Sequence, residues 1–386
     1  MYKGILLIFS LLVFGASLAQ AKLSSKCLGQ LANLKFISVK NSYATGFSIR
    51  SYQNFKLLRV KNPFQKKSGD FNYLLAKDLK NIKGICPQIL RLKIPVEKIV
   101  ALSTTHLTPL EELGAEKKLI GFSNIRFINS EKINRLVLAK KIREVGAPPN
   151  PEIVLSLKPD VVFAYATQNP SVEGIKRLQQ LKIPVVFNAE YREKTPLARA
   201  EWIKFAAAFL DSDSLAKNKF NTIKNDYNSL KEKVAELAKK RPIVAVGKNV
   251  NGIWKAPSGD SDFVHLIKDA GADYIWEKLS ATGPVSISLE MAVKDFENVQ
   301  YWLPQNSWKN LKDMVFEDKR YLKFQVYKNK NIYNNNNKVN PRGGNDYWEK
   351  ALMRPDLLLA DLVKIFHPSE APEHKLIWYK KLLEVQ

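Results

Sequence analysis

Short apolar runs alternate with helical segments along most of the chain. In the first half, from residue 96 onward, the runs lie at 98–102, 119–122, 161–165 and 185–188. This alternation is typical of βα units, whose strands form a parallel sheet. A second series begins at 243–247 and continues through 299–303 and 324–327. The pattern therefore predicts an α/β protein with two βα lobes.

One long amphipathic helix is predicted between the two series. Six apolar residues recur there at alternating spacings of three and four: Phe220, Ile223, Tyr227, Leu230, Val234 and Leu237. This spacing places them on one helix face. A helix over 213–238 would be about 39 Å long at 1.5 Å per residue. A coiled coil is the alternative, but the pattern covers fewer than four heptads and no nearby segment repeats it. We expect a single long helix to join the lobes.

The region before the first βα unit has a strand-like pattern. Apolar and polar residues alternate over 47–52, and apolar runs follow at 57–60 and 73–76, with breakers at 62–63 and 68–69. This predicts a β-hairpin appendage. The expected division is a signal peptide at 1–21, a β-rich appendage at 22–95, a first lobe at 96–211, the connecting helix at 212–240 and a second lobe at 241–386.

The N-terminal residues have the pattern of a secretory signal peptide. Lys3 precedes an uncharged stretch over 4–18 and the small-x-small triplet at 19–21, so cleavage is expected after Ala21. A retained membrane anchor is the alternative, although the apolar core is short for a bilayer span. Lys26, directly before Cys27, does not fit a lipid-attachment site. We expect a secreted, periplasmic protein.

Export would place the two cysteines in an oxidising compartment. We therefore predict that Cys27 and Cys86 form a disulfide. It would close a loop of about 60 residues and contribute roughly 4 kcal/mol in the chain-entropy model. Two buried thiols are the alternative.

Composition excludes several classes of protein. The chain has 386 residues, 45% of them hydrophobic, with 17 Gly and 19 Pro. These values do not fit low-complexity disorder or collagen. The formal charge is +24, but basic residues are interspersed with acidic ones and no block of five like charges occurs. We therefore expect a solvated basic surface and no nucleic-acid partner.

Catalytic sequence motifs are mostly absent. The chain has no P-loop, no dinucleotide-binding fingerprint, no H-E-x-x-H, no C-x-x-C and no G-x-S-x-G. An enzyme on the same two-lobed frame, such as a metal chelatase or a hydrolase, stays open as an alternative. Its only sequence support is His106 near Glu111 or Glu190.

Loops that follow the predicted strands supply candidate ligand-binding residues, because ligands of parallel sheets bind beyond strand C-termini. In the first lobe they are Thr105, His106, Arg126, Tyr165, Tyr191 and Arg192, and in the second Trp254, Trp308, Arg342 and Trp348. Trp and Arg suit a large, flat, anionic ligand through stacking and charge-assisted hydrogen bonds. Each aromatic taken singly is more often a core residue than a site residue, so the argument depends on several loops converging.

Several segments, in this order, resemble the substrate-binding proteins of ABC importers for iron-siderophore complexes, haem and vitamin B12. They include Leu157-Lys158-Pro159-Asp160, Gly343-Gly344-Asn345-Asp346-Tyr347-Trp348, Arg354-Pro355-Asp356 and His367-Pro368. The resemblance implies two lobes joined by a rigid helix. It also implies a metal chelate or corrinoid bound between them and delivered to an importer permease. A metal would then be held only within the ligand, with no intrinsic cofactor, and the receptor would be a monomer.

The same resemblance suggests where the importer docks. Such receptors place one exposed acidic residue on each lobe to engage arginines of the permease. Ser288-Leu289-Glu290 is similar to the second-lobe motif, and Glu173 lies near the first-lobe position. The alternative for both residues is a solvated carboxylate on a helix face.

Overall fold

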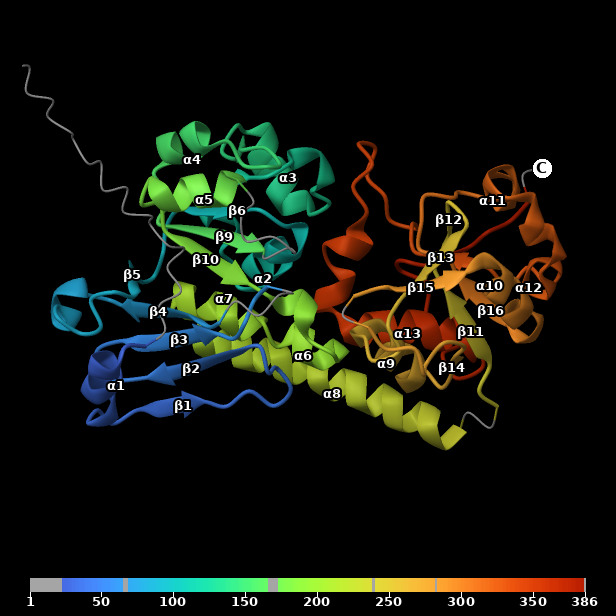
Figure 1. Cartoon of the computed structure of the whole chain (residues 1–386), viewed down its shortest axis with the longest axis horizontal. Helices are drawn as coiled ribbons and strands as arrows, with labels where there is room; N and C mark the ends of the chain where they lie inside the picture. Colours follow the sequence, from blue (N-terminus) through green and yellow to red (C-terminus); the bar gives the residue numbers. More distant parts are fainter. Residues whose placement is uncertain (1–22, 65–68, 166–172, 238–239, 282, 385–386) are drawn as a thin grey trace, which may run out of the picture.

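The computed structural model describes residues 23–64, 69–165, 173–237, 240–281 and 283–384. The predicted signal peptide at 1–21 lies outside these residues. Two α/β lobes lie side by side along the long axis of the molecule, and the N-terminal sheet lies at the far end of the first lobe (Figure 1). Among the helices of the described ranges, none is both long enough and apolar enough to span a membrane.

A five-stranded parallel sheet forms the first lobe, in the order β10-β9-β6-β7-β8. The strands are β6 (Ile99–Ala101), β7 (Leu119–Phe122), β8 (Arg143–Glu144), β9 (Val161–Tyr165) and β10 (Val185–Asn188). The helices are α2 (Leu107–Glu112), α3 (Glu131–Leu138), α4 (Pro151–Leu157), α5 (Glu173–Gln180), α6 (Pro196–Ala200) and α7 (Ile203–Leu210). Strand order reverses between β6 and β9, and loops that diverge at such a point leave a crevice.

Helix α8 (Asp213–Leu237), 25 residues long, joins the lobes. It packs on α7 of the first lobe and on α9 (Asp262–Asp269) and α13 (Pro355–Phe366) of the second. Figure 1 shows it running beneath both lobes. The predicted two-lobed α/β fold with one long connecting helix is confirmed.

The second lobe combines two small sheets. A parallel one has the order β14-β11-β16 and an antiparallel one the order β12-β13-β15. Their strands are β11 (Ile243–Val246), β12 (Lys248–Val250), β13 (Ile253–Ala256), β14 (Asp273–Tyr274), β15 (Val285–Ser288) and β16 (Tyr301–Leu303). The remaining elements are α10 (Leu289–Asp295), α11 (Leu311–Glu317), α12 (Gln325–Lys328), β17 (Tyr333–Asn334) and β18 (Lys380–Lys381). The apolar run at 324–327, placed with the strand-containing series by its sequence, overlaps helix α12 instead.

The N-terminal appendage is larger than the predicted hairpin. Strands β1 (Ile37–Val39), β2 (Phe47–Ser51), β3 (Lys56–Val60), β4 (Phe71–Ala76) and β5 (Leu90–Lys93) form one sheet in chain order. The first three pairs are antiparallel, and β5 adds parallel to β4. Helix α1 (Ser25–Ala32) is joined to the turn after β4 by the Cys27–Cys86 disulfide, which is the pairing that the sequence predicts.

Alternation along these strands gives the sheet two apolar faces. One face, which includes Phe47, Leu58 and Tyr73, belongs to the large core shared with the first lobe. The other face, which includes Leu57 and Leu74, packs under α1 and the disulfide in a small second core. The sheet is therefore part of the first lobe's packing, because one of its faces is buried there.

Candidate functional site

A cavity of about 1030 Å³ opens between the two lobes and is called the cleft below. Its first-lobe wall is the loop after β10, with Tyr191, Arg192 and Lys194. The second-lobe wall comes from the β12–β13 hairpin and from the segment before α9, including Lys255 and Asp260. Pockets for drug-sized ligands measure roughly 300–1000 Å³. The cleft therefore has room for a ligand of several hundred daltons.

Two ion pairs join the walls. The Lys194 ammonium lies 2.6 Å from an Asp260 carboxylate oxygen across the cleft. Asp260 also accepts a hydrogen bond from the Ser258 hydroxyl, and the two contacts, Lys194 first, lower the pKa of Asp260 to about 2. Deeper in, the guanidinium of Arg199 lies 2.9 Å from Asp262. The Asp260 carboxylate is therefore ionised and paired at neutral pH.

Two further cations of the cleft lack such a partner. Arg192 donates to the Phe64 carbonyl, and Lys255 donates to the Ser286 hydroxyl at 2.7 Å. Neither forms an ion pair with any carboxylate of the described residues. A cation held in a cleft without a counter-charge favours an anionic ligand, because a charge-assisted contact is stronger than a neutral one. The two cations are therefore candidates for contact with an anionic ligand.

A smaller hollow extends the cleft between the lobes. It shares Asp262, Phe263 and Gln305 with the cleft and is also lined by Trp348. The Trp348 side chain is about half exposed, and its backbone carbonyl accepts a hydrogen bond from Thr104 Oγ1 at 3.0 Å. The backbone is thus tied to the first lobe while the indole ring stays open to a ligand.

The first-lobe wall is anchored to the N-terminal sheet by two buried carboxylates. Glu193 accepts from the backbone N–H groups of Thr45 and Gly46 at 3.0 and 2.8 Å. Glu201, fully buried, accepts from the N–H groups of the three residues before them, Ser42, Tyr43 and Ala44. Five consecutive amides thus surround two carboxylates, an arrangement called a nest. The loop between β1 and β2 is named the nest loop below.

The backbone at the start of α9 makes a close approach that requires glycine. A Cβ atom on Gly259 would lie 1.8 Å from the carbonyl oxygen of Glu277. Ser261 then caps α9 by accepting from the Val264 N–H. This turn orients Asp260 toward Lys194. The turn Ser258-Gly259-Asp260-Ser261 is the sequence signal that could have indicated this wall, but Lys194, Lys255 and Asp260 were not among the predicted site residues.

Three predicted ligand-binding residues line the cleft or its extension: Tyr191, Arg192 and Trp348. Thr105 and His106 do not, because both are buried at the start of the helical turn before α2. The His106 ring packs edge-on to Phe163, and burial lowers its pKa to about 3. In this structure His106 is a neutral packing residue.

Two predicted residues, Arg126 and Arg342, lie at a different contact between the lobes. The Arg126 guanidinium stacks over its neighbour Phe127 at 4.5 Å. Arg342 donates to Asn134 Oδ1 at 2.6 Å, and Asn340 donates to the Arg126 carbonyl. These contacts tie the 338–345 segment to the first lobe. Tyr165 is exposed at the end of β9, next to residues outside the described ranges.

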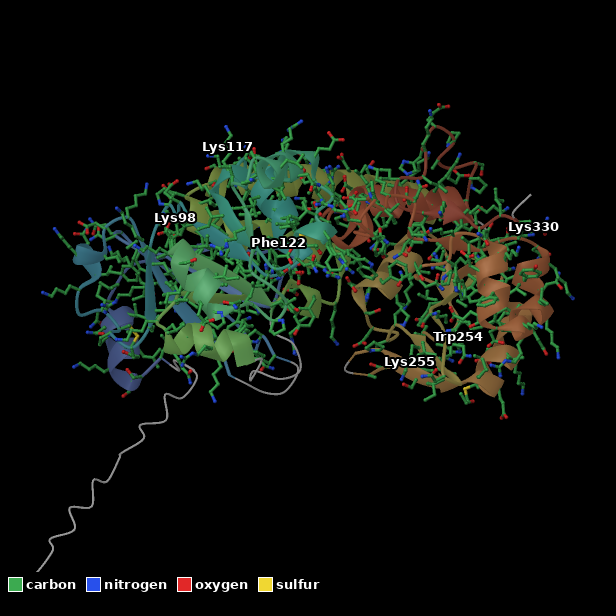
Figure 2. The ribbon with its side chains drawn as sticks, turned by 90° about the horizontal axis from the view of Figure 1, so that it is seen from above. Lys98, Lys117, Phe122, Trp254, Lys255 and Lys330 are labelled. Atoms are coloured by element: carbon green, nitrogen blue, oxygen red, sulfur yellow. A yellow bond between two sulfur atoms is a disulfide. The ribbon has the colours of Figure 1, made fainter. Side chains whose placement is uncertain are left out.

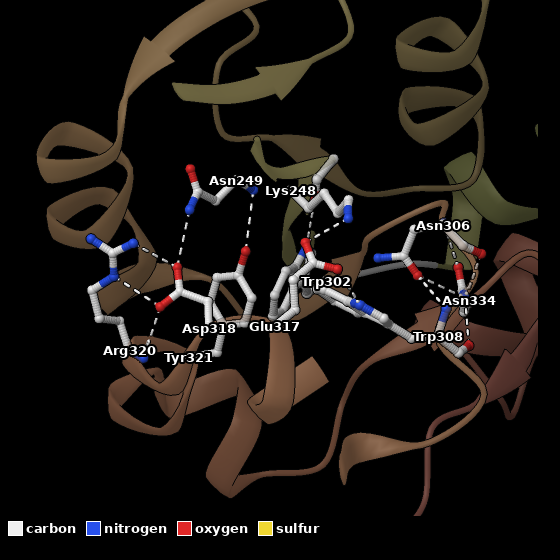
Figure 3. Close-up of polar contacts among 11 residues, drawn as sticks. Lys248, Asn249, Trp302, Asn306, Trp308, Glu317, Asp318, Arg320, Tyr321 and Asn334 are labelled. Atoms are coloured by element: carbon white, nitrogen blue, oxygen red, sulfur yellow. Dashed lines mark hydrogen bonds and ion pairs between the residues drawn. The ribbon is translucent and has the colours of Figure 1, made fainter. Parts of the chain in front are cut away.

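The placement of Trp254 and Trp308 on cleft-facing loops is wrong. Trp254, labelled in Figure 2, lies in β13, is fully buried and donates from its indole to the Val246 carbonyl. Trp308 packs edge-on to Trp302 and donates to Glu317 at 2.8 Å (Figure 3). Both rings pack in an aromatic core, where burial of their large apolar area stabilises the fold.

A second hollow of about 520 Å³ lies on the side of Arg126 and Arg342. Glu349, buried in its wall, accepts from the N–H groups of Asn129 and Ser130 of the first lobe at 2.6 and 2.9 Å. Burial raises the pKa of Glu349 to about 7, and the charge of Asp346 adds to this. Sequence reasoning did not find Glu349, because its partners lie more than 200 residues away.

The predicted docking residues lie at helix starts. Glu290 is exposed in the first turn of α10, where the Ser288 side chain caps the helix. Glu173 begins α5, but its side chain lies outside the described residues. Within the described ranges no group of three or more His, Cys, Asp or Glu could hold a metal ion.

Comparisons with known proteins agree on the fold. The sequence profile described as periplasmic binding protein matches residues 99–339. An uncharacterized lipoprotein of Methanocaldococcus jannaschii is 27% identical over 75% of this chain and 70% of its own length. A haem-binding periplasmic protein of Pseudomonas aeruginosa superposes with a TM-score of 0.54 at 17% identity, over 71% of this chain and 94% of that one. A molybdate-binding periplasmic protein of Haemophilus influenzae gives 0.56 at 19%, over 74% and 90%.

Proposed function

Because the chain belongs to the periplasmic binding protein family, we propose that it is the receptor of an ABC importer for an anionic metal chelate, haem or corrinoid. The ligand would bind in the cleft between the lobes. The observation that carries the proposal is the pair of cations, Arg192 and Lys255, that face a cavity of about 1030 Å³ without a carboxylate partner among the described residues. An anionic ligand supplies the missing counter-charge.

Two aromatic residues, Trp348 and Tyr191, have a role in this proposal. Trp348 presents a half-exposed indole beside the cleft, and a flat chelate or macrocycle can stack on it. Tyr191 accompanies Arg192 on the opposite wall, where its hydroxyl donates to the Pro63 carbonyl at 3.2 Å. A large, flat, negatively charged ligand would thus contact aromatic and cationic groups from both lobes.

Titration of the purified protein with haemin, ferric siderophores and cobalamin tests the ligand class. Binding should quench tryptophan emission, and Trp348→Phe should remove most of that change. The double variant Arg192→Gln/Lys255→Gln should weaken binding at least tenfold, because hydrogen bonds to charged groups contribute about 1.5–3 kcal/mol each. Lys312→Gln, an exposed lysine in α11, is the matched control and should bind as wild type. Equal affinity in the double variant and the control would rule out the cationic site.

Importer docking would use Glu290 on the second lobe and Glu173 on the first. An exposed carboxylate facing a permease arginine forms a charge-assisted pair that orients the receptor. Glu290→Ala should keep the ligand dissociation constant and slow uptake through a reconstituted importer. The double Glu173/Glu290 variant should slow it further. Weakened ligand binding with normal uptake coupling would instead place Glu290 in the cleft.

Delivery would take place outside the cytoplasmic membrane, after removal of the leader at 1–21. The disulfide fits an oxidising compartment. It also engages both cysteines of the chain, so neither thiol is free for a lipid while the bridge is intact. Mass spectrometry of the protein from its producing cell should give a chain starting at Lys22. A lipid-modified Cys27 would contradict both the leader and the pairing.

A further inference from the structure

The positive charge of the chain is concentrated at its N-terminal sheet. Residues 22–96 contain 15 Lys or Arg and two acidic residues, Asp70 and Asp78, a net charge of +13. The remaining 290 residues, 97–386, carry only +10. Charge asymmetry of this kind indicates a surface that meets an anionic partner.

Exposed apolar side chains lie at the same end of the molecule. Leu28 on α1 is 52% exposed, and Ile37 on β1 is 78% exposed. Leu34 and Phe36, between them, are also exposed, as is every residue from 32 to 38. Exposed large apolar residues that follow one another along the chain mark an interaction surface more often than scattered ones do.

Exposed lysines accompany these apolar residues. Lys26 and Lys35 lie on either side of Leu28 and Leu34 in sequence. A second exposed group, Leu79, Lys80 and Lys83, is on the turn after β4. The Cys27–Cys86 disulfide and the hydrogen bond from Gln30 to the Gly84 carbonyl hold this turn against α1. We name α1, residues 33–37 and the 79–83 turn the N-terminal patch.

The N-terminal patch lies at an edge of the five-stranded sheet. Strand β1 is the edge of the five-stranded sheet and pairs only with β2 among the described strands. Figure 1 shows α1 and β1 at the end of the molecule opposite the second lobe, away from the cleft. The N-terminal patch therefore stays accessible when the cleft is occupied.

We propose that the N-terminal patch binds the surface of an anionic lipid bilayer. Charge complementarity supports this partner, since each Lys or Arg near an anionic membrane surface contributes about 1 kcal/mol. Apolar side chains beside the lysines can enter the headgroup boundary, as in peripheral membrane-binding segments. A second copy of the chain fits less well, because two patches of the same positive sign repel each other.

The chain before the described residues points to the same partner. The uncharged apolar stretch over 4–18 ends seven residues before α1 begins at Ser25. Seven residues span at most about 25 Å. If that stretch enters a membrane during export, the patch would lie next to that membrane until the leader is cleaved. This inference concerns a surface away from the cleft and does not depend on which ligand the cleft binds.

Vesicle flotation tests the proposal with the chain that starts at Lys22, so that the apolar leader does not contribute. Vesicles of phosphatidylcholine with 30% phosphatidylglycerol should carry the protein at low salt, and vesicles of phosphatidylcholine alone should carry at least tenfold less. Lys26→Glu/Lys35→Glu should lower the partition coefficient at least tenfold, and so should Leu34→Ser/Ile37→Ser. All four positions are exposed, so the variants should keep the wild-type circular dichroism and ligand affinity.

Matched controls come from α11 and the turn that follows it in the second lobe. Lys312→Glu/Lys323→Glu removes the same charge, and Phe316→Ser removes a side chain that is 92% exposed. These variants should float like wild type. An equal loss in the controls would show that net charge alone acts and would overturn the patch. Three other results would also overturn the proposal. They are flotation that does not depend on phosphatidylglycerol, stronger binding to a DNA duplex through the same lysines, and a dimer that Ile37→Ser abolishes.

Discussion

Replacing Glu201 by Gln should loosen the nest loop and leave the second lobe intact. Glu201 Oε2 accepts from the N–H groups of Tyr43 and Ala44 at 2.8 Å each, and Oε1 receives the Lys204 ammonium. An amide keeps the shape of the side chain but has one acceptor oxygen and one NH₂ group. In either orientation of this amide, its NH₂ group faces either the backbone N–H donors or the Lys204 ammonium, and neither can accept a hydrogen bond from it.

The expected size of the effect follows from these contacts. Hydrogen bonds to a charged acceptor contribute about 1.5–3 kcal/mol each, and breaking a buried charge pair costs about 3–5 kcal/mol. Lys204 is only 8% exposed, so its ammonium cannot regain full hydration when the carboxylate is lost. We therefore expect local stability to fall by about 3–5 kcal/mol. At 1.4 kcal/mol per factor of ten, the loop should open roughly a hundredfold to a few thousandfold more often.

Hydrogen–deuterium exchange measured by mass spectrometry is the suitable assay, because it reports the opening of the nest loop itself. The peptide covering 41–46 should exchange faster in Glu201→Gln, while peptides from β16 should be unchanged. Lys204→Met, combined with it, should restore part of the protection by removing the unpaired ammonium.

An exposed ion pair provides the control. Glu97 is 65% exposed and lies 2.8 Å from Lys118, and such surface pairs contribute at most about 1 kcal/mol. Glu97→Gln should leave the loop's exchange as in wild type. If the exchange rate of the nest loop rose less than tenfold in Glu201→Gln, or if exchange rose evenly over both lobes, buried carboxylates would not hold the sheet to the first lobe.

Three other predictions concern the disulfide and two titrating groups. Cys27→Ser/Cys86→Ser should lower the stability of the N-terminal sheet by about 4 kcal/mol. Reductant should lower the melting temperature of the wild type and leave that of the variant unchanged. A wild-type melting temperature that does not change with reductant would contradict the prediction. Burial lowers the pKa of His106 to about 3. Between pH 6.5 and 3 the unfolded chain therefore binds a proton at His106 that the folded chain does not. The free energy of unfolding should fall by up to about 1.4 kcal/mol per pH unit as the pH drops through this range. Urea titrations of His106→Leu should show a smaller fall, and an unchanged slope would count against a neutral His106. The pKa of Glu349 is raised to about 7, so its stabilising contribution is complete below pH 4.5 and is lost as pH rises through 7. Glu349→Gln should remove this part of the pH dependence of stability. If the variant and wild type showed the same dependence of unfolding free energy on pH, Glu349 would be ionised throughout.

Local periodicity was enough to predict the lobes and the connecting helix. The apolar runs at 98–102 and 161–165 became β6 and β9, and the spacing over 213–238 became α8. The run at 324–327 is too short for periodicity to separate a strand from a helix. The five-stranded sheet was underestimated because β1 is exposed, and because the parallel pairing of β5 with β4 is not visible in local sequence.

Site residues were harder to predict because they meet only in space. Lys194 and Asp260 are separated by 66 residues, and neither lies in a recognisable motif. Trp254 was misplaced because its sequence neighbours suggest a loop, whereas the residue occupies the central strand of a small sheet. Arg192 and Trp348 were found because they follow structural signals, a strand end and a glycine-rich turn.

The ion pair across the cleft would compete with a bound ligand for its two charged groups. Lys194 pairs with Asp260 across the cleft, so a ligand that separates them would have to compete with Asp260 for Lys194. Both side chains are exposed to solvent, so water would hydrate the separated charges, and a neutral molecule of the same shape would lose at most about 1 kcal/mol of binding free energy. An anionic ligand could replace Asp260 as the partner of Lys194, so discrimination against uncharged analogues should shrink slightly when both residues are replaced by neutral ones.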